Sequence, residues 1–557
     1  MDLKTLTAGL SVSAQIFPAD MEAIKKAGFR AIICNRPDGE GADQPTFQEI
    51  ASTAKKEGLE AVYLPIVSGK VSDDDAAAFD KAMTELPGPV LAYCRTGTRS
   101  ATLWSLAQAS QQSVADILAA TKAAGYDMGG VVRRIANGGK TPTDTGDANY
   151  EIVIVGAGAG GIAAAASLKT RKPDLEIAII DPADIHYYQP GWTMVGGGVF
   201  DAQDTARTMG SLIPKGVHWI KAAVAAFEPE NNAIILDGCR VVKYQRLIVC
   251  PGIKLNWNGI EGLVATLGQN GVTSNYRYDL APYTWQLVER MKAGRAIFTQ
   301  PPMPIKCAGA PQKAMYLSAD AWLRRGVLKD IDIAFNNAGG VLFGVKDYVP
   351  ALMEYVHRYS ASLNFFHNLV AVDGPAKKAW FDVAEPDTET RRIEVEFDMM
   401  HVCPPQTAPD FIRVSPLADA AGWVDVDQAS LRHKTYDNIW SLGDVMNAPN
   451  AKTMAAARIQ APVVAANIVA DIHGKSPVAQ YNGYGSCPLT VERGKIVLAE
   501  FGYGGTLLPS FPKAIIDGTK PSRAAWFLKE KMLPPIYWKG MLKGREWMAK
   551  PEDVTAS

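Results

Sequence analysis

The chain has 557 residues, of which 47% are hydrophobic and 21% charged, and its formal net charge is -1 at pH 7. This length exceeds what one hydrophobic core serves and predicts about three or four domains. The composition is that of a soluble globular protein. The balanced charge gives no sign of a nucleic-acid-binding protein, because such proteins carry a basic excess.

The seven cysteines are widely spaced along the chain. They form neither a disulfide framework nor a metal-ligand pattern, so we expect no metal site and a reducing compartment. The N-terminal residues lack the basic segment followed by an apolar one that marks a signal peptide. We therefore expect a cytoplasmic protein.

Residues 1–136 predict a small α/β domain, because short apolar strands alternate with helical patterns. The strands are predicted at 31–34, 61–66 and 90–94, and the helices at 19–27, 46–57 and 74–85. Residues 137–150 are rich in Gly, Pro, Thr and Asp and predict a linker. Strands and helices resume over 151–470, and 471–557 looks like a separate C-terminal segment.

A dinucleotide-binding loop is predicted at 156–161. The apolar strand "EIVIV" runs into Gly156-x-Gly158-x-x-Gly161 and then into an alanine-rich helix. The first glycine permits the tight turn, the second lets the backbone approach a pyrophosphate, and the third lets the helix pack on the strand. Asp181 ends the next predicted strand, where an acidic side chain binds ribose hydroxyls.

A second element favours FAD over NAD. Residues 438–449 predict a strand that ends in Gly443-Asp444, followed by a helix at 452–468. Flavoproteins with two dinucleotide-binding domains return to the FAD domain with such a Gly-Asp pair, and its carboxylate accepts from a ribityl hydroxyl. The segment "LIVCPG" (247–252) matches the strand through which that class leaves the FAD domain.

Where a second glycine loop is expected, the chain instead has "PMPIKCAGAPQK" (302–313), with three prolines and a cysteine. Five segments together resemble sulfide:quinone oxidoreductases, closest to the mitochondrial-like type, in the order of that family. They are 186–198, 304–322, 401–405, 415–427 and 481–489. The resemblance implies two interleaved Rossmann-type domains over 151–470, the second at about 275–400. It further implies sulfide oxidation at Cys307, with electrons passing through FAD to a quinone.

The resemblance also implies which positions contact FAD. These are Gly156, Gly158, Gly160, Gly161, Asp181, Gln189, Val224, Gly443, Asp444 and Lys452.

One departure from the family is serious. A second cysteine normally follows the Gly-Asp pair, and here that position is Val445, which cannot act as a nucleophile or carry a persulfide. Cys250 and Cys403 both lie at predicted strand ends and are candidates for the missing partner, although packing in those strands is the favoured explanation for both. A third alternative is that Cys307 works alone and passes its sulfur to a thiol acceptor.

The N-terminal domain carries a second candidate site in "VLAYCRTGTRSATLW" (90–104). A strand ends at Cys94, and the loop turns into a helix near Ser100, so backbone N–H groups converge on the sulfur. Arg95 and Arg99 are expected to stabilise a sulfur anion. The Cys-x4-Arg spacing resembles rhodanese sulfurtransferases, whereas the domain resembles a phosphatase. We therefore expect sulfur transfer, with a phosphatase and an inert anion-binding module as the alternatives, and Arg36 is open between a catalytic and a salt-bridge role.

Residues 523–547 mix aromatic and basic side chains around Pro534-Pro535. This pattern favours a segment at a membrane interface, where the quinone is found, over a spanning helix, and packing against the protein itself is the alternative. A homo-oligomer is compatible with the sequence. Two rival functions remain: an NADH:quinone dehydrogenase, and a phosphatase-like or regulatory protein whose flavin half is altered at Val445.

Overall fold

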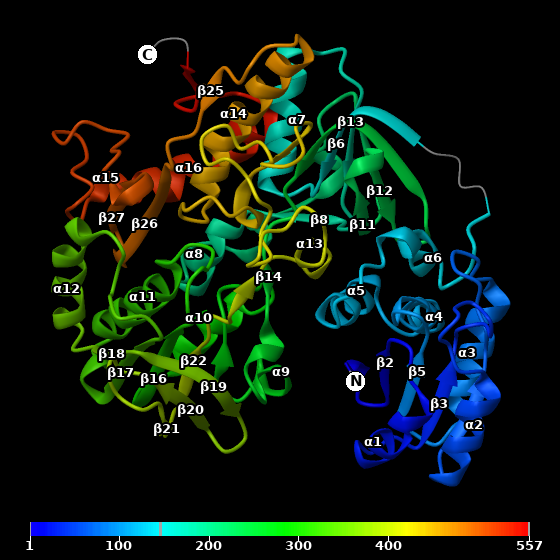
Figure 1. The fold of residues 1–557 in the computed structure, drawn as a ribbon. Helices are drawn as coiled ribbons and strands as arrows, with labels where there is room; N and C mark the ends of the chain where they lie inside the picture. Colours follow the sequence, from blue (N-terminus) through cyan, green and yellow to red (C-terminus); the bar gives the residue numbers. More distant parts are fainter. Residues whose placement is uncertain (1, 144–147, 555–557) are drawn as a thin grey trace. The chain divides into compact units, whose positions relative to one another are not determined.

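The structure, a computed structural model, describes residues 2–143 and 148–554. Its contacts divide the chain into two compact units (Figure 1). Unit 1 comprises Met1–Tyr150, Ala222–Tyr244 and Asp410–Ala418, and unit 2 comprises Glu151–Lys221, Gln245–Pro409 and Asp419–Ser557. Within the predicted linker, 144–147 lie outside the described residues.

Unit 1 is built on a five-stranded sheet in the order β1-β2-β5-β3-β4. All neighbours are parallel except the pair formed by β1 and β2. The strands are β1 (Lys4–Thr7), β2 (Leu10–Ser13), β3 (Ala31–Cys34), β4 (Glu60–Tyr63) and β5 (Val90–Tyr93).

Helices cover both faces of this sheet because successive strand residues point to opposite sides. Ala31 and Ile33 join the core under α3, α4 and α5, whereas Ile32 and Cys34 join the core under α1 and α2. The helices are α1 (Met21–Lys26), α2 (Phe47–Lys56), α3 (Asp73–Glu85), α4 (Thr98–Gln108), α5 (Val114–Ala123) and α6 (Val132–Ala136). The predicted α/β fold of this part is confirmed.

Two segments from the middle of the chain also belong to unit 1. The hairpin of β11 (Val224–Glu228) and β12 (Ala233–Leu236) packs Ala226 and Ile235 against Val132 of α6. Arg133 donates to both carboxylate oxygens of Glu228, at distances of 2.6 to 3.2 Å. A short helix, α13 (Asp410–Arg413), completes the unit.

The first sheet of unit 2 follows the dinucleotide-binding pattern. β6 (Ala148–Val155) pairs in parallel with β7 (Ile177–Ile180), which pairs with β10 (Val217–Ile220). On the other side of β6 lies β13 (Val241–Val249), which pairs in parallel with β24 (Ile439–Ser441). The last four residues of β6 are all buried, as expected for a parallel sheet covered on both faces. The helices α7 (Ala159–Arg171) and α14 (Met454–Ile472) pack against each other.

The second sheet of unit 2 has the order β15-β22-β16-β17-β18, and all of its neighbours are parallel. Its strands are β15 (Val272–Thr273), β16 (Gly294–Gln300), β17 (Ile331–Asn337), β18 (Ser362–Phe365) and β22 (Met399–His401). The helix α11 (Ala310–Arg324) follows β16 and buries Met315 and Trp322 in this core. Two parallel sheets within unit 2 confirm the predicted two-domain flavoprotein class.

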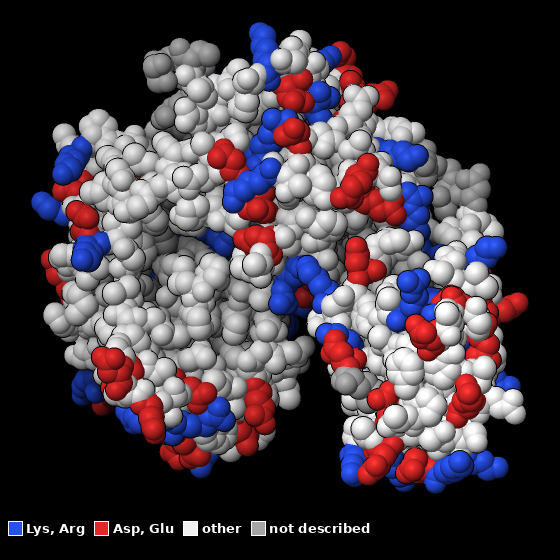
Figure 2. All heavy atoms as spheres, in the orientation of Figure 1, with Lys and Arg blue, Asp and Glu red and all other residues white. Residues whose placement is uncertain are grey.

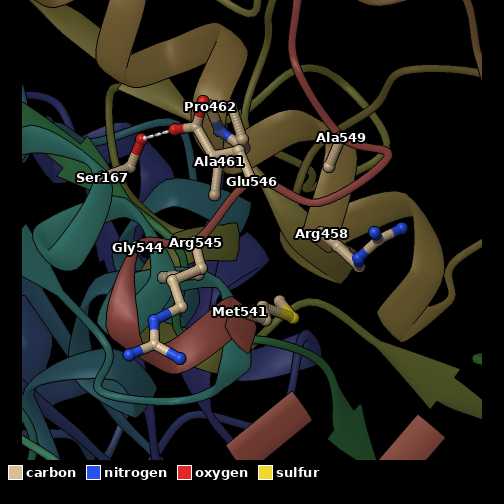
Figure 3. Close-up of a pocket in the computed structure, with 10 residues that line it drawn as sticks. Ser167, Arg458, Ala461, Pro462, Met541, Gly544, Arg545, Glu546 and Ala549 are labelled. Atoms are coloured by element: carbon tan, nitrogen blue, oxygen red, sulfur yellow. Dashed lines mark hydrogen bonds between the residues drawn. The ribbon is translucent and has the colours of Figure 1, made fainter. Parts of the chain in front are cut away.

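The C-terminal part of unit 2 closes over these sheets. A hairpin of β26 (Gly485–Glu492) and β27 (Lys495–Phe501) packs on α11. The segment after it begins with α15 (Arg523–Phe527) and continues through helical turns to Lys543. Figure 3 shows how its end lies on α7 and α14: Glu546 accepts from Ser167 at 2.6 Å and pairs with Arg171.

One described helix, α14, is long and apolar enough to cross a membrane by length and composition. Most of its apolar stretch is buried, and it packs on α7. We therefore regard α14 as a core helix of unit 2.

Candidate active site

The glycine loop has the geometry that a pyrophosphate requires. Gly156 has a φ of +101°, which favours glycine, and α7 begins at Ala159. A Cβ on Gly161 would lie 1.9 Å from the Gly156 carbonyl oxygen, so the close contact of helix and strand excludes any side chain there. A Cβ on Gly158 would meet nothing within 4 Å. The backbone at Gly158 therefore faces open space at the start of a helix, where an anion binds.

Asp181 lies beside this loop, at the carboxyl end of β7. Its carboxylate accepts from the Ala157 N–H at 2.7 Å and from the Ala183 N–H at 2.8 Å. Gly160 packs closely on Leu442, since a Cβ there would come within 2.9 Å of that side chain. The loop, the acidic residue and the strand that precedes the Gly-Asp pair thus lie together.

The Gly443-Asp444 turn is held by two polar side chains. The N–H of Gly443 donates to Gln460 at 2.8 Å, and the Lys452 ammonium donates to the carbonyl oxygens of Asp444 and Met446. Burial lowers the pKa of Lys452 to about 8 and raises the pKa of the half-buried Asp444 carboxyl. A Cβ on Gly443 would meet open space, as at Gly158.

These residues fit FAD. Unit 2 holds two turns, at Gly158 and Gly443, where a ligand can approach the backbone, and a carboxylate belongs to each turn or lies beside it. Gln189 accepts from Lys306, the neighbour of Cys307, at 2.6 Å. Val224 lies in β11 of unit 1 and stays a prediction from the sequence.

Cys307 lies in the turn between β16 and α11, where a second dinucleotide would place its phosphates. Its φ of +50° is uncommon for a residue with a side chain and marks backbone held by its surroundings. Its N–H donates to the Lys452 carbonyl oxygen at 2.8 Å, which ties the cysteine to the chain that follows the Gly-Asp turn. Cys307 is therefore anchored beside the residues that fit FAD.

A second sulfur lies against Cys307. The Sγ atoms of Cys307 and Cys487 are 3.4 Å apart. Cys487 belongs to β26, which packs on α11, and its side chain is 2% exposed. A Cβ on Gly309 would lie 2.5 Å from the Cys487 sulfur, so the glycine makes room for that sulfur. Cys487 lies in 481–489, one of the five segments that carry the family resemblance, but the spacing of the two cysteines does not indicate their pairing, because tertiary packing brings them together across 180 residues.

Two buried lysines face the sulfur pair. The Lys313 ammonium donates to Cys307 Sγ at 3.0 Å from the first turns of α11. The hydrogen bond from Cys487 and the charge of Lys313 hold the pKa of Cys307 well below its usual range, and the same hydrogen bond raises the pKa of Cys487. Burial, with repulsion from Lys313, lowers the pKa of Lys529 to about 7. The site therefore favours a thiolate on Cys307.

The other candidate partners face different groups. The Cys250 thiol lies against the Gly156 carbonyl oxygen, and burial raises its pKa. The Cys403 sulfur lies against Pro404 O and Gln406 Nε2, and burial raises its pKa to about 12. Val445 is fully buried. The pairing of Cys307 with a sulfur is thus made by Cys487 in the structure.

In unit 1, Cys94 lies at the end of β5 in a loop that leads into α4. The Gly97 N–H donates to the Cys94 sulfur at 3.1 Å, and α4 begins at Thr98. The Arg99 guanidinium donates to the Ile66 carbonyl oxygen at 2.6 Å and to Glu40 at 2.7 Å. Arg95 is exposed. The predicted loop between β5 and α4 is present, and Arg99 is buried beside it.

Glu40 belongs to this site although no sequence pattern pointed to it. Its carboxylate also accepts from Arg36 at 2.8 Å, so one acidic group holds two buried arginines. The hydrogen bond from Arg99 lowers the pKa of Glu40. Arg36 is 8% exposed and therefore belongs to this network, not to the solvated surface.

The fold and the site together define an FAD-dependent oxidoreductase of the two-dinucleotide-domain class. Residues 150–284 match the family model "Pyridine nucleotide-disulphide oxidoreductase". The chain is 41% identical over 403 residues to the mitochondrial sulfide:quinone oxidoreductase of Dictyostelium discoideum, covering 72% of this chain and 87% of that protein. The chain belongs to the sulfide:quinone oxidoreductase family.

A solved structure supports the same fold. The sulfide:quinone oxidoreductase of Aquifex aeolicus has a TM-score of 0.58 and 19% identity, covering 71% of this chain and 92% of that one. Residues 2–111 match the family model "Beta-lactamase hydrolase-like protein, phosphatase-like domain". This part is 34% identical over 121 residues to the Beta-lactamase hydrolase-like protein of Agrobacterium fabrum, covering 21% of this chain and 28% of that protein.

We expect Gly158→Val to abolish FAD binding, because the valine side chain would fill the space where the pyrophosphate meets the backbone. The flavin absorbance per polypeptide measures the loss. Gly344→Val is the matched control: a Cβ on this exposed glycine would also meet open space, and the variant should retain FAD. Full flavin content in Gly158→Val would remove the loop from the FAD site.

We expect Lys313→Met to raise the pKa of Cys307 by about 1 to 3 units, since an opposite charge at hydrogen-bond distance favours the thiolate. The rate of Cys307 alkylation in reduced protein should then rise at higher pH than in the wild type, because only the thiolate reacts. Peptide mass spectrometry across a pH series measures this midpoint. The control Lys329→Met, at an exposed position, should leave the pH midpoint of Cys307 alkylation unchanged. An unchanged midpoint in Lys313→Met would show that the Lys313 charge does not influence the Cys307 thiolate.

Proposed function

We propose that this chain oxidises sulfide and passes the electrons through FAD to a quinone. The observation that carries the proposal is the Cys307 turn: a nucleophilic sulfur beside a buried ammonium, at the place where the class otherwise holds a second dinucleotide. The relatives that the chain matches over most of its length carry this activity in their name.

The residues of the chain position the Cys307 sulfur and stabilise its negative charge. Lys313 stabilises negative charge on Cys307, and the backbone link from Cys307 to Lys452 fixes the sulfur near the Gly-Asp turn. When bound, FAD accepts two electrons from sulfur and releases them to the quinone. The turn at 302–309 has no glycine cradle for a nicotinamide cofactor, which argues against NADH as the donor.

The C-terminal segment supports contact with a membrane that holds the quinone. Phe527 is 57% exposed and Met532 is 44% exposed, although neighbouring Trp526 and Tyr537 are buried. In Figure 2, residues other than Lys, Arg, Asp and Glu cover a broad area in the middle of unit 2, and charged side chains lie along its lower and left edges and at its top. We place the protein as a peripheral membrane protein on the cytoplasmic side, where its seven free cysteines stay reduced.

For unit 1 we propose transfer of sulfane sulfur. The Cys94 loop directs the Gly97 N–H at the sulfur and places Arg99 beneath it, an arrangement that holds an anionic persulfide. The match to a phosphatase-like domain favours phosphate-ester hydrolysis as the second candidate. The Cys-x4-Arg loop is one residue shorter than the phosphatase Cys-x5-Arg loop, which favours sulfur. A thiol is the further acceptor that we expect.

The first test is anaerobic titration of the purified holoprotein with sulfide. We expect sulfide to bleach the flavin band in the wild type, and Cys307→Ser to lose this response because a serine hydroxyl does not ionise near neutral pH. Cys239→Ser, a buried cysteine of unit 1, should respond as the wild type does.

Two other outcomes would contradict the proposal. Bleaching by NADH but not by sulfide would identify an NADH dehydrogenase. Bleaching by dithionite alone would identify a flavin without a catalytic role and favour a regulatory protein.

The second test addresses unit 1. We expect Cys94→Ala to leave the first flavin reduction intact and to slow multiple turnover several-fold at low external thiol, because a tethered acceptor acts at roughly millimolar effective concentration. Sulfide consumption and p-nitrophenyl phosphate hydrolysis are measured on the same preparation, with Cys239→Ala as the control. Loss of ester hydrolysis with unchanged sulfide turnover would establish the phosphatase instead.

A further inference from the structure

In unit 1, the buried arginine of the Cys94 loop is paired with a carboxylate, Glu40. We propose that Glu40 sets the substrate class of this loop: it makes the loop a site for singly charged sulfur anions, such as a persulfide R–S–S⁻, and disfavours dianions such as phosphate esters and thiosulfate. This inference rests on the sulfur transfer proposed for unit 1 and adds a specificity-determining residue to it.

The parallel sheet of unit 1 brings Glu40 to the Cys94 loop. Because β3 and β5 are neighbouring parallel strands, the segments that follow them leave the same edge of the sheet. One Glu40 oxygen accepts from Arg36 Nε at 2.8 Å and from Arg99 Nη2 at 2.7 Å. A Cβ on Gly41 would lie 2.8 Å from Arg36 Nη2, so the residue after Glu40 also packs closely on this arginine. The fold therefore holds the carboxylate against two guanidinium groups.

Glu40 occupies part of the binding capacity of Arg99. Arg99 Nη1 donates to the Ile66 carbonyl oxygen at 2.6 Å, and Nη2 donates to Glu40. At least two of the five N–H groups of Arg99 are thus engaged within unit 1 before an anion arrives. Arginine binds phosphate best through two parallel N–H bonds, so a partly engaged guanidinium is a weaker phosphate ligand.

The charges of the network balance one negative charge. Arg36 and Arg99 contribute two positive charges and Glu40 one negative charge, which leaves a single positive charge. The hydrogen bond from Arg99 lowers the pKa of Glu40, so the carboxylate is ionised near neutral pH. Both arginine side chains are buried and that of Glu40 is 25% exposed, so solvent screens these charges only in part.

Transfer of sulfur from a persulfide keeps this balance. The Cys94 sulfur bonds to the outer sulfur of R–S–S⁻, the S–S bond of the donor breaks, and the departing R–S group takes the one proton that the reactants share. The products are a Cys94 persulfide anion and the thiol R–SH, and no external oxidant or reductant is needed. One negative charge is present before and after this step. A phosphate ester or thiosulfate would bring two negative charges to the same network.

The effect of Glu40 on a bound anion should scale with the charge of that anion, since the Coulomb energy is proportional to it. Removing the Glu40 charge is therefore expected to change the logarithm of the affinity twice as much for a dianion as for a monoanion of the same shape.

The first arm of the test measures this charge selection without requiring any activity. Perchlorate and sulfate are tetrahedral anions with one and two charges. Each should protect Cys94 of the full-length holoprotein from iodoacetamide at constant ionic strength, as followed by peptide mass spectrometry. We expect Glu40→Gln to strengthen protection about threefold for perchlorate and about tenfold for sulfate. Equal changes for the two anions, unchanged protection, or protection by neither anion would overturn the inference.

Two further variants complete this arm. Gln15 accepts from Arg36 Nη1 at 2.9 Å, so Gln15→Glu adds a negative charge to the same network and should weaken protection by sulfate more than by perchlorate. This variant decides the question if Glu40→Gln does not fold. Glu57→Gln removes the same charge at an exposed position between α2 and β4, at the opposite edge of the sheet, and should behave as the wild type does.

The second arm compares sulfur transfer with ester hydrolysis in a Cys307→Ser background. The donors are the persulfide of 2-mercaptoethanol, with one charge, and thiosulfate, with two, and mass spectrometry detects the Cys94 persulfide. We expect transfer from the persulfide to exceed transfer from thiosulfate, and Glu40→Gln to reduce this preference and to raise p-nitrophenyl phosphate hydrolysis. Lower ester hydrolysis in Glu40→Gln would identify Glu40 as the proton donor of a phosphatase and would overturn the inference.

The two arms keep this inference apart from the proposed function. If neither donor places sulfur on Cys94, the proposed sulfur transfer fails, whereas the first arm still reports on the charge selection by Glu40. If sulfur is transferred and Glu40→Gln affects both anions equally, sulfur transfer stands and the role of Glu40 is refuted.

Discussion

A buried ammonium needs a negative partner, and this constraint organises the core of unit 2. Lys313 is fixed on α11 with its charge directed at Cys307, and the partner it selects is a thiolate. The turn that carries Cys307, the glycine that admits the second sulfur, and the hairpin packed on α11 all serve this pairing. The Lys313 ammonium stabilises the Cys307 thiolate, and the thiolate in turn stabilises the buried ammonium. The packing of this core and the chemistry of its cysteine therefore depend on each other.

The sequence is most informative where function depends on local backbone. The glycine loop, the Gly-Asp turn and the cysteine before α11 each lie within a few residues of the element that positions them, and all three occupy the expected places. The partner of Cys307 cannot be obtained in this way. Strand ends near the flavin domain suggest Cys250 and Cys403, whereas Cys487 lies inside a strand whose partner helix is fixed only by the tertiary fold.

The same limit applies to unit 1. The spacing of Cys94 and Arg99 predicts the loop, but the Glu40 carboxylate reaches Arg99 from a segment 59 residues away. An anion that enters this loop meets an arginine that is already paired. The affinity of the loop is therefore set by a competition with an internal carboxylate, a property that the Cys-x4-Arg pattern does not contain.

The long separation between Cys307 and Cys487 has a consequence for biosynthesis. Chains emerge at about 5 to 20 residues per second, so the second sulfur follows the first by roughly 9 to 36 seconds across the intervening 180 residues. During that interval α11 and its thiol exist without the hairpin that covers them. A nascent chain thus passes through a period in which the Cys307 sulfur is not covered by the hairpin, and oxidation at that moment would alter this sulfur before β26 packs on α11.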